Sequence, residues 1–344
     1  MTTYQGIHGR PIRALSSDLS GAAAEGEVWY NTDSNLLRVM YPFTGWTTVD
    51  TMVQARTGMS GCGIVTAGLA VGGVSGTIGV TSATYSEEYD GTSWAAGGTL
   101  TQAREQSGAF GTQAAGAVCG GRINDGNPGP TYSTNKTEEY NGSSWTAGGN
   151  YPLIVLTEST TGTLTAGLGG AGSTTPADPS VDTNVSAEYD GTSWAAGNPV
   201  VTARRDTCVG PQGTQTAGLC IDGRAGTTHS TATEEYDGTC WATAGSTPAT
   251  IRAGLCFGTL TACLAGYGHQ GGQGTVVAAC TTYDGTSWSA APTGGTARYF
   301  VAGVGASSSS GLACGGTYLP GWVQPGATEE FSSTGTVVKT ITTS

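Results

Sequence analysis

The chain has 344 residues, and only 11% of them are Asp, Glu, Lys or Arg. Its formal net charge of −12 repels phosphate backbones, so we expect no nucleic-acid partner. No apolar run approaches the ~20 residues that a membrane helix needs, so we expect no membrane insertion. The start of the chain has no basic patch followed by an apolar stretch, and a signal peptide is not expected.

The first 50 residues fall into two segments. Residues 1–25 are rich in small side chains and predict an irregular N-terminal arm. Residues 26–50 predict a β-hairpin module, because two β-rich runs flank the polar turn Asn31–Asn35. Trp46–Val49 adds a third short strand that leads into ring closure, and residues 51–344 form the main domain.

An aromatic motif recurs along the main domain: a tyrosine, then Asp-Gly or Asn-Gly, then a tryptophan. Successive copies lie 47 to 51 residues apart, a period that a disordered tract would have no reason to keep. A sixth copy at Phe331 has no tryptophan, and a degenerate early copy ends at Trp46. The repeat residues are Trp46, Trp94, Trp145, Trp194, Trp241, Trp288, Tyr89, Tyr140, Tyr189, Tyr236 and Tyr283.

Each repeat contains landmarks that predict four strands. The first strand follows an arginine, and a glycine turn leads to a second strand such as the one that opens with Thr66–Leu69. A variable loop precedes the third strand, which ends at the tyrosine. Asp-Gly then predicts a type I′ turn into the fourth strand, because glycine accepts positive φ. A lone sheet of this length cannot bury its faces, whereas sheets packed around a ring can.

The sequence therefore predicts an all-β fold, a β-propeller with four-stranded antiparallel blades. The repeat tryptophans and tyrosines are expected to fill the space between neighbouring blades. Six blades are favoured, with the strand at Trp46 completing the last blade. The alternative is a seven-bladed ring whose seventh blade combines the N-terminal meander with part of the C-terminus.

The chain has nine cysteines, and none forms a CxxC pair. Cys119 and Cys314 each precede a Gly-Gly pair, at the repeat position where Val71 and Ile221 stand. They are thus expected to behave as small buried apolar residues. We expect reduced core thiols rather than a disulfide framework, which implies assembly in a reducing cytoplasm.

The order Trp, Arg, Gly-Gly, Tyr, Trp over residues 46–331 resembles the kelch repeat. The resemblance implies a propeller, but kelch-type propellers include binding modules, structural proteins and an oxidase. Gly26–Val39 also looks like a module common in structural proteins of tailed phages, and the repeated Glu-Tyr-Asp-Gly-Thr-Ser-Trp phrase is similar to kelch-like phage proteins. Together these resemblances imply a virion component assembled in the host cytoplasm.

The sequence shows no singular catalytic or metal-binding motif. His8, His229 and His269 lack metal-ligand spacing, so a copper site of the kelch-oxidase kind is not expected. Asp90–Trp94 is similar to the box of sialidase propellers, but it places Asp directly beside Gly, which suits a hairpin turn. The acidic repeat residues recur with the fold, whereas a catalytic pair should be singular. We expect no metal, no cofactor and no enzymatic activity.

One face of the predicted propeller, the loop face, carries the connections from second to third strands and from fourth strands to the next repeat. These connections hold the length variation, and variable loops on a rigid scaffold often bind ligands. Arginines open five of the six repeats on this face, and Leu156 takes the place in the third. The candidate ligand-binding residues are Arg56, Arg104, Arg204, Arg252 and Arg298.

Two interpretations of the arginines stay open. A ring of guanidinium groups can hold a carboxylate or sulfate of a host glycan. Alternatively, each arginine pairs with a carboxylate of the repeat and has a structural role. The expected partners in that case are Glu88, Glu139, Glu188, Glu235 and Glu330.

Three functions follow from this reading. The favoured one is a non-enzymatic phage virion structural protein of the tail-fibre or appendage type. Its N-terminal region would contact other virion proteins or sister subunits of a homo-oligomer, and its loop face would meet a host-surface glycan. The second is a capsid or tail decoration or cement protein with no host ligand, and the third, least favoured, is a glycan-active enzyme.

Overall fold

The computed structural model describes residues 12–19, 27–75, 82–124, 132–156, 159–174, 181–208, 213–271 and 275–340. Every regular element within these ranges is a β-strand, which confirms the predicted all-β fold. The described part of the chain has no helix of the length and apolarity needed to cross a bilayer. The chain divides into two compact units, one made of Met1–Gly45 with Ser332–Ser344 and the other of Trp46–Phe331.

The predicted N-terminal hairpin is present in the first unit. β2 (Val28–Asn31) pairs antiparallel with β3 (Leu36–Val49), in a register that joins Val28 to Val39. Asn31 caps the polar turn of the hairpin, because its Oδ1 accepts the backbone N–H groups of Asp33 and Ser34. β3 continues without a break to Val49, so the third short strand predicted at Trp46 is the end of β3.

Part of the predicted arm is ordered rather than irregular. β1 (Arg13–Leu15) pairs in parallel with β2, and this pairing helps to cover Trp29, which is fully buried. Asp18 accepts a hydrogen bond from the Trp29 indole Nε1 at 3.3 Å. The prediction of an irregular arm is therefore wrong for residues 12–19. This segment is ordered because the buried Trp29 indole needs apolar cover and a polar partner, and the segment supplies both. Residues 1–11 and 20–25 of the predicted arm lie outside the described ranges.

The first sheet of the second unit has the four strands predicted for each repeat. They are β4 (Ser60–Ile64), β5 (Ala67–Val71), β6 (Ser86–Tyr89) and β7 (Trp94–Ala96), and they pair antiparallel in chain order. β4 and β5 are almost wholly buried, whereas β7 is exposed after its tryptophan. The predicted order of the landmarks along a repeat is confirmed here.

The next four sheets follow the same plan. The second contains β8 (Gly108–Thr112), β9 (Ala115–Cys119), β12 (Thr137–Tyr140) and β13 (Trp145–Ala147). The third contains β14 (Ser159–Thr163), β15 (Ala166–Gly170), β16 (Ser186–Tyr189) and β17 (Trp194–Ala196). The fourth contains, among the described residues, β18 (Gly218–Ile221), β21 (Thr233–Tyr236) and β22 (Trp241–Thr243). The fifth contains β23 (Ile251–Arg252), β24 (Leu255–Thr259), β25 (Ala262–Gln270), β26 (Val276–Tyr283) and β27 (Trp288–Ala291).

Two small hairpins extend the loop face. They lie between the second and third strands of the second and fourth sheets. The hairpins pair β10 (Arg122–Ile123) with β11 (Tyr132–Ser133) and β19 (Arg224–Ala225) with β20 (Thr228–His229).

The last sheet joins the two ends of the repeat region. Its order is β28 (Ala302–Ser307), β29 (Ser310–Cys314), β30 (Thr328–Thr340) and then β3. The hydroxyl of Thr47 donates to the Glu330 carbonyl at 3.3 Å. The N-terminal strand at Trp46 thus lies where the six-bladed interpretation expected it, although the number of blades remains a prediction.

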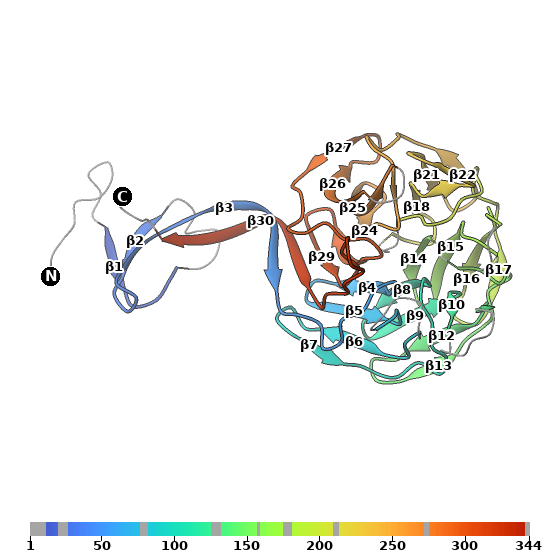
Figure 1. Ribbon diagram of the computed structural model, residues 1–344, viewed down its shortest axis with the longest axis horizontal. Helices are drawn as coiled ribbons and strands as arrows, with labels where there is room; N and C mark the ends of the chain where they lie inside the picture. The colour runs from blue at the N-terminus through green and yellow to red at the C-terminus, as the bar shows by residue number, and fades with distance from the viewer. Residues whose placement is uncertain are drawn as a thin grey trace. The chain divides into compact units, whose positions relative to one another are not determined.

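The sheets of the second unit are arranged as a β-propeller. Inner strands contact one another from sheet to sheet: β4 contacts β8 and β28, β8 contacts β14, and β28 also contacts β24. Figure 1 shows β4, β8 and β14 near the centre of this unit and β7, β13, β17, β22 and β27 at its rim. Glycine allows the close approach of inner strands, because a Cβ on Gly61 would lie 2.6 Å from the Gly303 carbonyl oxygen.

The turn after each repeat tyrosine differs from the predicted type I′ turn. That turn needs positive φ at both central residues, but only Gly91 has it in the first sheet, at 95°. Asp90 instead caps a four-residue loop, because its Oδ1 accepts the N–H groups of Thr92 and Ser93, both at 2.8 Å. The side-chain cap takes over the role that a second left-handed residue would have.

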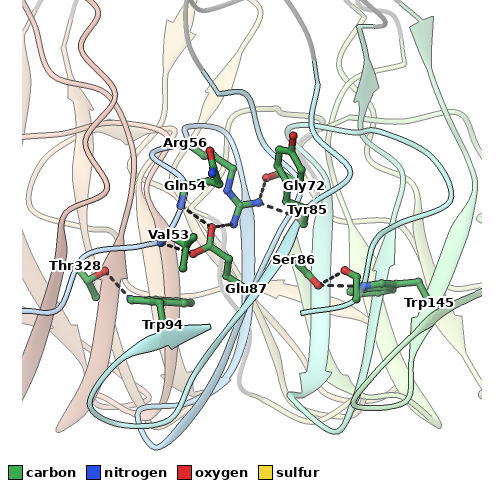
Figure 2. Close-up of polar contacts among 11 residues, drawn as sticks. Val53, Gln54, Arg56, Gly72, Tyr85, Ser86, Glu87, Trp94, Trp145 and Thr328 are labelled. Atoms are coloured by element: carbon green, nitrogen blue, oxygen red, sulfur yellow. Dashed lines mark hydrogen bonds and ion pairs between the residues drawn. The ribbon is translucent and has the colours of Figure 1, made fainter. Parts of the chain in front are cut away.

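The repeat tryptophans reach from one sheet to the sheet before it. Trp94 Nε1 donates to the Thr328 hydroxyl at 3.0 Å, and Trp145 Nε1 donates to the Ser86 hydroxyl at 3.3 Å (Figure 2). Trp194, Trp241 and Trp288 donate to hydroxyls of Thr137, Ser186 and Thr233 in the same way. These contacts confirm that the repeat aromatics lie between neighbouring blades.

Trp46 takes the corresponding place for the last sheet. Its Nε1 donates to the Pro292 carbonyl at 3.1 Å, and its ring packs against Tyr267 with centroids 5.4 Å apart. The last repeat, which has no tryptophan after Phe331, therefore receives one from the N-terminal strand.

Replacing Trp145 with Ala should lower the free energy of unfolding by about 3–5 kcal/mol. The indole is only 5% exposed and packs between the first two sheets beside Leu69 and Val118. Trp322→Ala is the matched control, because Trp322 is 57% exposed and should change stability by about 0.5 kcal/mol or less. Urea denaturation followed by circular dichroism measures both, and equal losses would contradict the wedge role of Trp145.

Candidate functional site

Four of the five candidate arginines are fully buried: Arg56, Arg104, Arg204 and Arg298. Each forms an ion pair with a glutamate on the third strand of its own sheet. The N–O distances are 2.8 Å for Arg56–Glu87, 2.6 Å for Arg104–Glu138, 3.0 Å for Arg204–Glu234 and 3.1 Å for Arg298–Glu329.

The pair in the first sheet shows how tightly such a guanidinium group is held. Arg56 Nη1 also donates to the carbonyl oxygens of Gly72 at 2.7 Å and Tyr85 at 2.9 Å (Figure 2). Glu87 in turn accepts the backbone N–H groups of Val53 and Gln54. The pair thus closes the start of the first strand onto the third, and no surface of the arginine is open to solvent.

The prediction that Arg56, Arg104, Arg204 and Arg298 bind a ligand is therefore wrong, since a buried, paired guanidinium cannot reach one. The structural alternative is correct in kind, but the partner is Glu87 rather than Glu88. Adjacent residues of a strand point to opposite faces, and this alternation was missed in choosing the carboxylate.

The expected partners have a different role, between sheets. Glu88 accepts a hydrogen bond from the Tyr140 hydroxyl at 2.6 Å, so the next sheet is tied to the one before it. Tyr189 donates to Glu139 in the same way. Tyr236 donates to Glu188 and Tyr283 to Glu235, each at 2.6 Å.

The third sheet lacks both members of the buried pair. Val155 rather than Leu156 stands at the position of the arginine, because its carbonyl accepts the Gly121 N–H as the Arg104 carbonyl accepts the Gly73 N–H. Ala187, two residues before the tyrosine, stands in place of the glutamate. Both are buried. The joint loss agrees with the cost of leaving one charge buried without the other.

The fifth sheet also lacks both members of the buried pair. Ile251 stands at the position of the arginine, because its carbonyl accepts the Gly223 N–H as the Arg104 carbonyl accepts the Gly73 N–H. Thr281, two residues before Tyr283, replaces the glutamate.

Arg252 therefore does not belong to the series of buried arginines, as the sequence had suggested, but lies one residue later, where the second and fourth sheets have Glu105 and Arg205. Its Nη1 lies 3.5 Å from Asp206 of the fourth sheet, and its side chain is 12% exposed.

Arg252 belongs to a group of ionisable residues on the loop face, called here the Asp206 cluster: Asp206, Arg224, His229, Arg252 and His269. Arg224 Nε donates to Asp206 Oδ2 at 2.7 Å. Strand pairing sets Arg224 opposite His229 and Arg252 opposite His269. The small hairpin of the fourth sheet and the β23–β25 strand pair of the fifth sheet therefore meet at the Asp206 carboxylate.

A chain of backbone hydrogen bonds positions Asp206. The Phe300 N–H donates to the Ala253 carbonyl, and the Ala253 N–H donates to the Asp206 carbonyl, both at 2.8 Å. Asp206, Ala253 and Phe300 all have φ near 52°. With Gly58 and Gln106, which are joined in the same manner, they line a small pocket where the inner strands begin. The carboxylate is thus held by the framework of the propeller and not by a mobile loop.

The two imidazoles of the cluster are neutral at pH 7. Burial lowers the pKa of His269 to about 4, and the charge of Arg252 adds to this effect. Burial also lowers the pKa of His229, followed by the charges of Arg252 and Arg224. The charged groups are then two guanidinium ions and one carboxylate, a local positive surplus in an acidic protein.

Aromatic side chains continue the cluster onto the last sheet. The His269 ring lies against Tyr299, with centroids 4.2 Å apart. Tyr299 packs edge to face against Trp322 at 6.0 Å, with 74° between the rings. Tyr299 is buried and Trp322 is exposed, so the row of rings runs from the cluster to the surface.

The remaining sequence predictions concern metals and thiols. The described ranges contain no group of three or more His, Cys, Asp or Glu side chains that could hold a metal ion. His8 lies outside those ranges. The nine cysteines are thiols outside any disulfide, and eight are buried, as predicted, whereas Cys240 is exposed. Burial raises the pKa of Cys62 and of Cys314 to about 12 each, which makes these thiols poor nucleophiles.

Sequence reasoning missed three parts of this site: Asp206, Arg224 and Trp322. One signal was available for the fifth sheet, because Thr281 interrupts the glutamate series of the repeat. Trp322 is likewise a tryptophan outside the repeat register. Neither signal indicates that these residues meet, since they come from three different sheets.

Comparison with known proteins supports the fold. The chain matches no protein-family model and no curated protein. Among solved structures it is similar to YjhT, with a TM-score of 0.64 and 13% sequence identity. The match covers 85% of this chain and 96% of that one. At this identity the likeness shows a shared propeller-type fold.

The expectation that the chain has no enzymatic activity is corrected by this likeness. That expectation depended on the lack of a singular catalytic motif in the sequence. A propeller like that of YjhT brings loops from several sheets together, so side chains distant in sequence can form one site, and the fold hosts enzymes as well as binding modules. The missing motif therefore gives no ground for excluding an activity.

Removing one member of a buried ion pair should lower the free energy of unfolding more than removing both members. We expect Arg104→Leu to lower the free energy of unfolding by about 3–5 kcal/mol, because Glu138 is left charged and buried. The double variant Arg104→Leu with Glu138→Ala resembles the natural third sheet, which has the apolar Val155 and Ala187 at these positions, and should recover part of that loss. Urea denaturation of the wild type, both single variants and the double variant measures this, and a double variant as unstable as the sum of its single changes would contradict the pairing argument.

A second prediction concerns Asp222, a fully buried carboxyl group in the fourth sheet that accepts a hydrogen bond from Thr247. Burial raises the pKa of Asp222 to about 8. The folded state then binds more protons than the unfolded state, whose pKa is ~3.9, so this group makes stability fall as pH rises from about 4 to 8.

Asp222→Asn should remove this slope and stabilise the protein above pH 8, by about 1–3 kcal/mol, with little effect below pH 4. Asn also suits the positive φ of 55° at this position. Thermal unfolding across pH 4 to 9 measures the change. Asp33→Asn, at an exposed position, is the control and should keep the wild-type pH dependence.

Proposed function

We propose that the chain is a kelch-like propeller protein of a tailed-phage virion, of the tail-fibre or appendage type, and that its loop face recognises a host-surface glycan. The kelch-like repeat and the phage-like phrase at Gly26–Val39 support the origin. The observation that carries the recognition role is the Asp206 cluster. There Arg252, which has no glutamate on its own sheet, lies with two further charged groups, Asp206 and Arg224, on the face with the variable loops.

The division of the chain supports a role in presenting the propeller. Residues on both sides of the propeller in sequence, Met1–Gly45 and Ser332–Ser344, form one smaller unit. Such a separate unit suits contact with other virion proteins or with sister subunits, and leaves the propeller to meet the host.

Phage particles that carry a chain without residues 1–25 should lack this protein and adsorb to host cells at least about tenfold more slowly. The full chain supplied in trans should restore both properties. Immunogold electron microscopy measures incorporation, and the loss of free phage from a cell suspension measures adsorption. Mass spectrometry of the host glycans after contact with the particles shows, in addition, whether the glycans are cleaved.

The two readouts separate the candidate roles. Normal incorporation of the shortened chain would contradict attachment through the N-terminal region. Normal adsorption of particles that lack the protein would contradict host recognition and favour a decoration or cement role.

A further inference from the structure

We infer that the Asp206 cluster and Trp322 form a binding site for an acidic sugar residue, whose single carboxylate or sulfate group pairs with Arg252 and Arg224. This inference rests on the proposed function and names the ligand class and residues for the loop face. It depends on four observations: the donors of Arg252, the local charge, His269 and the exposed indole.

Arg252 has donors that its own protein does not use. Arg56, a buried arginine of the first sheet, makes contacts of 2.7, 2.9 and 2.8 Å to two carbonyls and a carboxylate. Within the described residues, the Arg252 side chain makes one contact, of 3.5 Å to Asp206, and it is 12% exposed. A guanidinium group has five N–H donors, and leaving them unpaired is costly, so an anion would be stabilised here.

The charge of the cluster suits a monovalent anion. Arg224 and Arg252 share Asp206 as their carboxylate, which leaves one positive charge uncompensated. The Arg224 side chain is 28% exposed, so both guanidinium groups can be reached from solvent. A carboxylate or sulfate ester on a sugar supplies one negative charge and two oxygens for paired N–H donors. The net charge of −12 disfavours a dense polyanion such as nucleic acid.

His269 supplies a polar group without a partner. The residue is only 6% exposed, and its Nδ1 has no hydrogen-bond partner in the described part of the chain. The imidazole is neutral at pH 7, so it can donate or accept one hydrogen bond. Its position opposite Arg252 in the strand register suits a sugar hydroxyl next to the charged group.

Trp322 supplies an apolar surface for the sugar ring. It lies in the loop between β29 and β30, is 57% exposed, and is held at one edge by Tyr299. The C–H face of a pyranose ring is apolar, and an indole covers it while leaving the sugar hydroxyls in water. Tyr299 also contacts His269, so the buried Tyr299 ring links the indole to the imidazole beside Arg252.

Isothermal titration calorimetry on the full chain tests the site with three probes: trigalacturonate, a sulfated galactose trisaccharide and uncharged galactotriose. We expect at least one acidic probe to bind about tenfold or more tightly than galactotriose. Arg252→Met should reduce the affinity for that acidic probe to the level of galactotriose and leave galactotriose itself unchanged. Trp322→Ala should weaken all three, because the sugar ring loses its platform.

Two further variants control for the charge and the fold. Arg122→Met is the matched control, because Arg122 occupies the position of Arg224 in the second sheet and pairs with Glu105. It should leave every affinity within about twofold of wild type. Arg252→Lys keeps the charge but not the planar fork, so an intermediate affinity is expected. Thermal unfolding verifies that each variant is folded. If Arg252→Met is unfolded, the affinities of Arg252→Lys and Trp322→Ala test the site in its place.

The inference is overturned if neither acidic probe binds more tightly than galactotriose, or if Arg252→Met and Trp322→Ala both bind as wild type does. Adsorption of particles separates this result from a failure of the proposed function. Particles with Arg252→Met and Trp322→Ala that adsorb normally would sink this site while host recognition stands. Binding of an acidic probe through Arg252, in a protein absent from particles, would support the site and sink the virion role.

Discussion

The contact between an indole of one sheet and a hydroxyl of the sheet before it is the interaction on which the propeller depends. A four-stranded sheet buries too little surface alone, so each must pack on its neighbours. The tryptophan ring supplies the apolar area, and its Nε1 finds a partner such as Ser86 or Thr137 across the interface. Trp46 makes the equivalent contact from the N-terminal strand, which extends the same chemistry to the last sheet.

Within each sheet the buried arginine–glutamate pair has a different task. It joins the start of the first strand to the third and satisfies backbone groups such as the N–H of Val53 and the carbonyl of Gly72. A buried charge without its partner is costly. The third sheet avoids this cost by losing both residues. The fifth also loses both, with Ile251 and Thr281 in their places, and Arg252, one residue later, contacts Asp206 of another sheet.

An arginine outside the buried pairs changes what the loop face can do. The buried arginine–glutamate pairs recur in the repeat and support the fold. A residue that occurs in a single sheet can instead belong to a single binding site. Here Arg252 occurs together with Trp322, an exposed ring outside the repeat register, and with a backbone chain that holds Asp206 in a left-handed conformation. The likeness to YjhT shows the fold and leaves the chemistry of this face to its own side chains.

The sequence by itself determined the all-β fold, the strands of each repeat and the placement of the aromatics, because these follow from local period and turn residues. It also placed the strand at Trp46 in the last sheet. Only the tertiary structure decided that Glu87 rather than Glu88 meets Arg56, since a one-residue step in a strand reverses the face. It alone decided that Arg252 meets Asp206 of another sheet and that Trp322 packs on Tyr299, because contacts between sheets leave no spacing in the chain.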